Sequence, residues 1–132
     1  MSLKDEIQNR FKSDVESILA DQIGEVEGMF EFHEDGTIEL GSKYRELNIE
    51  NQILLYLIAR RYQYEGDLAD TKSIEYGEMY TRFPKKDEST IRGYFMNLRN
   101  DGFARKSDEG HEMVVERLLE AVNRLKSAVS ES

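Results

Sequence analysis

Residues 87–103 read DESTIRGYFMNLRNDGF, a stretch that combines a helical apolar repeat with a start and a stop signal. Its apolar side chains recur at spacings of three, four and seven residues, at Ile91, Tyr94, Phe95 and Leu98. Such spacing places them on one side of a helix that can pack on a core. Asp87 is suited to cap the helix, and Gly102 to end it in a left-handed conformation. The stretch therefore predicts an amphipathic helix.

The other side of this predicted helix is polar. It carries Ser89, Thr90, Arg92, Asn97 and Arg99. These side-chain types donate hydrogen bonds to phosphates and to the edges of bases. The helix also lies in the most basic part of an acidic chain, so contact with nucleic acid is the leading hypothesis for this face.

Two further helices are predicted upstream. Residues 48–65, NIENQILLYLIARRYQYE, carry the strongest helical pattern in the chain, and Asn48 can cap it. Residues 75–83 form a shorter helical pattern that Pro84 ends. Downstream, residues 103–106 and 111–115 are extended runs joined by residues 107–110, which predicts a hairpin.

The order of three helices and a hairpin over residues 48–115 resembles the winged helix-turn-helix family. The resemblance rests on IEYGEMYTRF (74–83), STIRGYFMNLRNDGF (89–103) and FARKSDEGHEMVV (103–115). It implies that the third helix enters the major groove of duplex DNA while the hairpin, or wing, contacts the neighbouring backbone. The expected function is sequence-specific DNA binding in the regulation of transcription. We expect DNA contacts from Lys85, Lys86, Ser89, Thr90, Arg92, Asn97, Arg99, Arg105 and Lys106.

Within this set, Arg92 and Asn97 are the best candidates to read base edges, and the other cations to hold phosphates. Two features depart from the family pattern. The linker 66–73 is long and acidic, and Asp87 and Glu88 open the third helix. Acidic residues at a helix start complement the helix dipole, but they would oppose DNA if they shared a surface with Arg92 and Asn97.

Charge supports both the DNA hypothesis and an alternative. Residues 82–106 hold seven cations and three anions, a net of +4, whereas the whole chain carries −9, which leaves −13 on the other residues. A basic patch on an acidic body is compatible with DNA binding. It is also compatible with a winged-helix protein-protein interaction module that does not bind DNA. A halophilic source is a further explanation for the acidity.

Elements at both ends of the chain flank this core. An apolar repeat predicts one N-terminal helix, with Leu3, Ile7, Phe11, Val15, Ile18 and Leu19 on its stripe. Residues 29–41, MFEFHEDGTIELG, predict a hairpin that could pair with the wing. A last helix spans residues 118–129, and residues 127–132 are expected to fray. The predicted fold is thus α+β, a three-helix winged helix-turn-helix core with flanking N- and C-terminal helices and an additional N-terminal β-hairpin.

We expect residues 1–47 to form an extension and residues 48–132 the winged-helix domain, together one compact unit. The terminal helices are candidates for a homodimer interface, because two-fold dimers suit two-fold DNA sites. The alternative is that both helices cover the core of their own domain.

Little in the chain indicates catalysis, so an enzyme is not expected, nor is a cofactor or a metal site. The sequence has no cysteine. His33 and His111 are interpreted as surface residues of two hairpins, and Asp67 and Asp70 as a solvated acidic loop. Six tyrosines in residues 56–94 either line a small-molecule pocket or lie at the edge of the core, and we favour the second interpretation. The chain shows no signal peptide or membrane span, which predicts a cytoplasmic protein.

Overall fold

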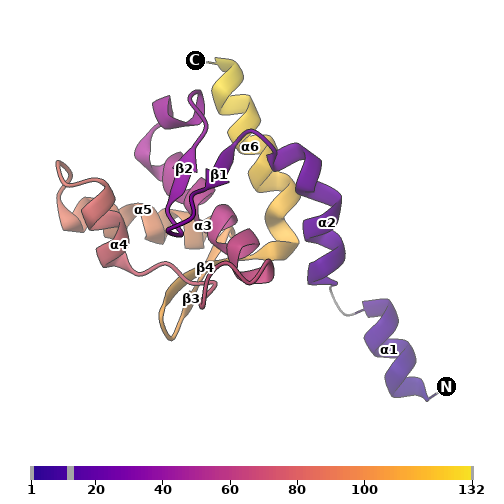
Figure 1. Ribbon diagram of the computed structural model, residues 1–132. Coiled ribbons are helices and arrows are strands. Elements are labelled where there is room, and N and C mark those ends of the chain that lie inside the picture. The colour runs from indigo at the N-terminus through magenta and orange to yellow at the C-terminus, as the bar shows by residue number, and fades with distance from the viewer. Residues whose placement is uncertain (1, 12–13, 132) are drawn as a thin grey trace.

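The computed structural model describes residues 2–11 and 14–131 and shows an α+β fold (Figure 1). In chain order the elements are α1 (Leu3–Phe11), α2 (Val15–Val26), β1 (Phe30–Phe32), β2 (Ile38–Leu40), the 3-10 helix η1 (Tyr44–Glu46), α3 (Ile49–Glu65), α4 (Tyr76–Arg82), α5 (Glu88–Asn100), β3 (Ala104–Ser107), β4 (Gly110–Met113), the 3-10 helix η2 (Val115–Arg117) and α6 (Leu118–Glu131). Figure 1 shows α1 apart from the rest of the molecule.

The predicted starts and stops of the central helices are confirmed. Asn48 caps α3, because its side-chain oxygen accepts a 2.8 Å hydrogen bond from the Asn51 amide. Asp87 occupies the cap position of α5, and α5 ends at Asn100. Gly102 follows at φ 87°, the left-handed conformation that glycine adopts without steric cost.

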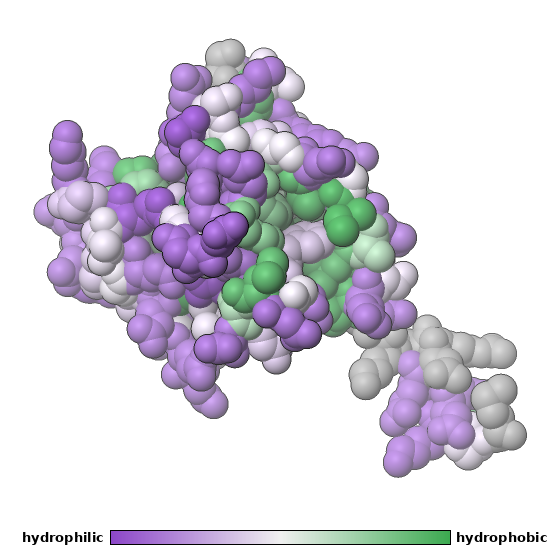
Figure 2. Space-filling view, in the orientation of Figure 1, coloured by the Kyte–Doolittle hydropathy of each residue, from purple (hydrophilic) through white to green (hydrophobic). Residues whose placement is uncertain are grey.

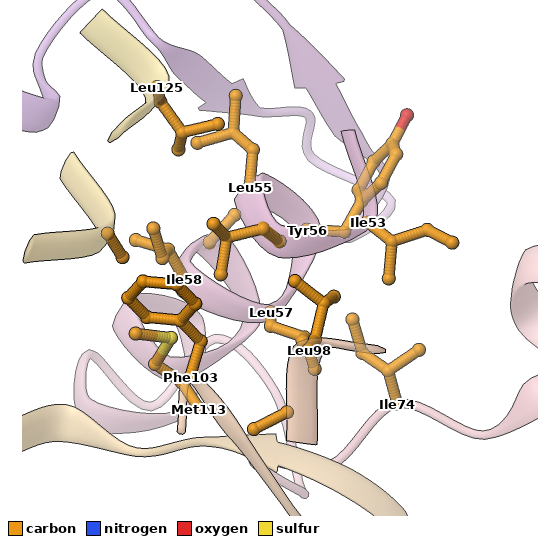
Figure 3. Close-up of a cluster of buried hydrophobic side chains, with 14 of the residues drawn as sticks. Ile53, Leu55, Tyr56, Leu57, Ile58, Ile74, Leu98, Phe103, Met113 and Leu125 are labelled. Carbon is orange, nitrogen blue, oxygen red and sulfur yellow. The ribbon is translucent and has the colours of Figure 1, made fainter. Parts of the chain in front are cut away.

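Helix α3 forms the centre of the core. Every residue from Ile53 to Ala59 is buried, so this helix is covered on all sides by α5, α6, β2 and β4. A helix that is apolar all round is stable only in such an interior position. Figure 3 shows side chains of α3 meeting Leu98 of α5, Phe103, Met113 of β4 and Leu125 of α6.

The two hairpins form two separate two-stranded antiparallel sheets. In the first, Glu31 pairs with Glu39, and in the second, Arg105 pairs with Glu112. The predicted pairing of the first hairpin with the wing is therefore wrong. The wing pairs instead with the segment before α4, through a backbone bridge between Ile74 and His111.

The chain ends differ from the prediction in two respects. The single N-terminal helix is two helices, α1 and α2, and residues 12 and 13 between them lie outside the described residues. Helix α6 continues to Glu131, so the expected fraying from residue 127 is not observed up to that point. The apolar stripe of α6 explains its length, because it packs against α2, α3 and η2.

The six tyrosines are divided between core and boundary. Tyr56 is buried, Tyr64 is exposed, and the other four are partly buried. The edge interpretation therefore holds except at Tyr56. In the described residues, no helix has the length and apolar character needed to cross a membrane.

Candidate nucleic-acid interface

Helices α4 and α5 and the short turn between them position most of the predicted contact residues. The inner face of α5 is fixed because Ile91, Phe95 and Leu98 are fully buried. Phe95 packs edge-on against Tyr76 of α4, with 5.2 Å between ring centroids. With that face held in the core, the opposite face of α5 is open to solvent.

The structure leaves nearly all the predicted contact residues accessible. Arg99 is partly buried, and the others are exposed, namely Lys85, Lys86, Ser89, Thr90, Arg92, Asn97, Arg105 and Lys106. Lys85 and Lys86 lie in the turn before α5, and Ser89 and Thr90 in its first turn. In the described part of the chain neither lysine forms an ion pair. Both are therefore available to an external anion.

Arg92 lies on the α4 side of the exposed face. Its guanidinium donates a 2.9 Å hydrogen bond to the Tyr80 hydroxyl. This bond, assisted by the negative charge of Glu88, raises the pKa of Arg92 above its ordinary value. Glu88 therefore shares a surface with Arg92, which is the arrangement that disfavours DNA contact at this position.

Asn97 lies on a different flank of α5. Five residues separate it from Arg92, which is about 140° around the helix axis. Its amide donates a 2.8 Å hydrogen bond to Glu50 at the start of α3. The structure therefore does not bring together the two predicted base-reading side chains.

The Asn97 contact belongs to a polar network at the junction of α3, α5 and α6. The guanidinium of Arg124 binds Glu50 at 2.8 Å, Asn51 at 2.9 Å and Asp101 at 3.2 Å. It also lies 5.5 Å from the centre of the Phe103 ring. These contacts hold three helices together, so Asn97 has a structural role.

The wing contributes one paired and one unpaired cation. Arg105 donates a 2.7 Å hydrogen bond to Glu112 on the neighbouring strand, and Lys72 lies 3.5 Å from the same carboxylate. Lys106 is exposed and, within the described residues, has no ion pair, and the same holds for the partly buried Arg99. Both lie close enough to His111 to lower its pKa through their charge. Arg99 in the C-terminal half of α5 and Lys106 in the wing thus both lie near His111.

His111 is buried at the base of the wing, so its interpretation as a surface residue is wrong. Only 1% of it is exposed, and its ring lies 4.8 Å from that of Phe95. Burial, reinforced by the charges of Arg99 and Lys106, lowers its pKa to about 4. Neither ring nitrogen has a hydrogen-bond partner within the described residues. The alternation of His111 with the buried Met113 along β4 is the sequence signal for this inward position.

Metal-binding geometry occurs elsewhere. Among the described residues, the side chains that could hold an ion together are Glu31, His33 and Glu39 of the first hairpin. His33 is exposed, as predicted. Asp67 and Asp70 do not come together with a third ligand in this part of the chain.

No protein-family model matches the chain, and neither the curated proteins nor the solved structures contain a significant match.

Proposed function

We propose that this chain binds duplex DNA as a winged-helix protein and regulates transcription. Helix α5 would lie in the major groove, and hairpin β3–β4 would contact the adjacent backbone. The order α3, α4, α5 and hairpin is compatible with the resemblance to winged helix-turn-helix proteins. The Ile74–His111 bridge supports the proposal, because it holds the wing against the same unit as α4 and α5.

One observation carries the proposal. The turn before α5 and its first turn present Lys85, Lys86, Ser89 and Thr90 together at the surface. The cations there would bind phosphates, and the hydroxyls beside them would reach phosphates or bases. The N-terminal end of a helix also favours anions through its dipole. Asp87 and Glu88 are exposed at the same end and offset the two lysine charges, so a DNA strand would bind here on the side that presents the lysines and the hydroxyls.

The contacts divide by role. Lys85, Lys86, Arg99 and Lys106 would hold phosphates, because none is paired with an acid in the described residues. Arg105 would join them after leaving Glu112. Arg92 would read base edges after leaving the Tyr80 hydroxyl and against the negative charge of Glu88, and Asn97 would do so only by leaving Glu50.

We further propose a homodimer in which α1 is the contributing terminal helix. Leu3 and Ile7 are 71% and 48% exposed on one side of α1. The stripe of α6, by contrast, is buried in its own core. An apolar cleft of about 540 Å³ lies between α2, β1 and α3, lined in part by Ile23, Phe30 and Tyr62. Figure 2 shows apolar surface beside α2, and α1 of a second copy would occupy this cleft.

A second candidate function is protein binding without DNA. The exposed face of α5 carries Met96, which is 51% exposed, and Glu88 adds negative charge next to Arg92. An apolar residue within a mixed-charge helix face suits a protein partner. The −13 net charge of the remaining residues would also repel DNA at low salt.

Fluorescence anisotropy with random-sequence duplex at low and at high salt separates the two functions. DNA binding predicts measurable affinity that falls steeply with salt, since released counterions drive association. With all seven cations of residues 82–106 on phosphates, the slope of log affinity against log salt would be roughly −6. No affinity at low salt would favour the protein-binding function.

A further inference from the structure

Three polar side chains gather on the outward face of hairpin β1–β2. Side chains alternate along a strand, so Phe30 and Phe32 point inward, where their rings stack 5.3 Å apart and the Phe30 ring lies 6.1 Å from that of Tyr62 in α3. Glu31 and His33 therefore point outward. The register places Glu39 directly opposite Glu31. The fold of the hairpin thus brings two carboxylates and an imidazole together.

Their spacing is close to that of a coordination shell. One ligand atom from each of Glu31, His33 and Glu39 lies within 4.8 Å of the other two. His33 Nε2 and Glu39 Oε2 are 3.1 Å apart. Two ligands at about 2.1 Å from a tetrahedral Zn²⁺ lie about 3.4 Å from each other. Small rotations of these side chains would bring all three ligand atoms to such distances from one another.

Electrostatics also favours a cation here. Carboxylates directly opposite each other on paired strands repel, which destabilises the pair unless a positive charge intervenes.

The surroundings leave the site open. An adjacent cleft of about 450 Å³ is lined by Glu27, Glu31 and Glu39, with Arg45 also on its wall. Glu27 adds negative charge, which outweighs the single arginine. Solvent can thus supply the coordination positions that the three side chains leave vacant.

We propose that Glu31, His33 and Glu39 bind a first-row divalent transition cation, of the Zn²⁺ class, with water as the remaining ligands. One imidazole nitrogen and two carboxylate oxygens suit such a cation better than Mg²⁺ or Ca²⁺, which prefer oxygen alone. The cation would join β1 to β2. It would stabilise a hairpin whose loop is already held to α3, where the Gln63 amide donates a 2.8 Å hydrogen bond to the Gly36 carbonyl. This site is separate from α5 and the wing and does not depend on the proposed DNA function.

The chain itself provides a selective probe. It has two histidines, and His111 is buried, so His33 is the accessible imidazole. Titration of the full chain, free of any histidine tag, with Zn²⁺ should shift the His33 ring resonances in NMR spectra and leave those of His111 in place. Calorimetry should give one cation per chain.

Single substitutions test the ligand set. His33→Ala and Glu39→Gln should each weaken Zn²⁺ binding by about tenfold or more, because each removes one of three protein ligands. Glu34→Gln is the matched control, since it removes one charge from the same hairpin outside the cluster and should leave affinity unchanged. Unchanged circular dichroism would show that each variant is folded. If a variant does not fold, the titration of the wild-type chain with Zn²⁺ still tests the site.

Several results would overturn the proposal. The cluster is not a site if Zn²⁺ fails to shift the His33 resonances, or if His33→Ala binds as tightly as the wild type. Equal losses for Glu34→Gln and Glu39→Gln would show diffuse attraction to an acidic surface. Mg²⁺ binding as tightly as Zn²⁺ would exclude the cation class proposed.

Discussion

Ile74 and His111 pair through both of their backbone groups. The Ile74 amide donates to the His111 carbonyl at 2.7 Å, and the His111 amide donates to the Ile74 carbonyl at 2.9 Å. This pair fixes the wing relative to the start of α4. Gly110 makes the approach possible, because a Cβ at this position would lie 2.3 Å from the Ile74 carbonyl oxygen.

Gly110→Ala should therefore destabilise the protein. The residue has φ 141°, which side-chain-bearing residues rarely adopt, and the added carbon would collide with backbone. We expect the free energy of unfolding to fall by about 2 kcal/mol or more. Urea unfolding followed by circular dichroism measures it. Gly77→Ala in α4 is the control, since open space surrounds that position and alanine should add about 0.5 kcal/mol. Equal stability of the two variants would contradict the role given to Gly110.

Stability should depend on pH through His111. Its pKa is about 4 in the folded state and about 6.5 when unfolded, so the unfolded chain takes up the proton first as pH falls. The free energy of unfolding is therefore unaffected by protonation of His111 above pH 6.5 and decreases as the pH falls from 6.5 towards 4. The loss at pH 4 should be roughly 3 kcal/mol.

Urea unfolding at pH 7, 5 and 4 checks this, with His111→Leu as the test variant. Leucine has no nitrogens to desolvate, so the variant should be at least as stable as the wild type at pH 7 and lose less stability on acidification. Parallel profiles for His111→Leu and the wild type would contradict this prediction.

Arg92 and Asn97 should behave differently when each is replaced by alanine. Arg92→Ala should weaken binding to a preferred duplex by about 1–3 kcal/mol and relax sequence preference. Asn97→Ala should lower the free energy of unfolding by about 1 kcal/mol and change DNA affinity little, because its amide binds Glu50. Anisotropy and urea titrations measure both. A loss of affinity in Asn97→Ala as large as in Arg92→Ala would show that Asn97 leaves Glu50 to reach DNA.

Removing the two lysines of the turn should change the salt dependence of DNA binding. In the double variant Lys85→Gln/Lys86→Gln, the slope of log affinity against log salt should become less negative by up to about two. Lys4→Gln/Lys43→Gln removes the same charge from exposed positions outside α4 and α5 and should leave the slope unchanged. The same slope in both variants would place the DNA contact elsewhere.

The homodimer should depend on α1. Leu3→Glu combined with Ile7→Glu should convert dimer to monomer in sedimentation equilibrium, because charges would enter an apolar interface. Leu119→Glu is the comparison, since Leu119 is 54% exposed on α6. If Leu119→Glu dissociates the dimer and the α1 variant does not, the interface lies on α6. A monomeric wild-type chain would exclude the dimer.

Local signals account for what the sequence predicts well. Asn48, Asp87 and Gly102 define helix ends within a few residues, so α3, α4 and α5 fall where the pattern places them. Both hairpins follow from alternating runs around glycine-containing turns. Each of these signals acts between neighbours in the chain.

Contacts between distant residues account for what the sequence misses. Arg124 reaches Glu50 and Asn51 from the other end of the chain, and no local pattern predicts this network or the capture of Asn97 within it. The break between α1 and α2 is hidden by an apolar repeat that continues across it. The facing of Glu31 and Glu39 requires the register of the hairpin, which the sequence alone leaves open.

The place of α6 in the core affects how the chain acquires its structure on the ribosome. Leu118, Ala121, Val122 and Leu125 cover α2 and α3 from a helix that follows them by many residues in the chain. Synthesis proceeds from the N-terminus, so the apolar surfaces of those earlier helices stay uncovered until α6 emerges. Nascent chains that stall before α6 are therefore exposed to aggregation and to chaperones.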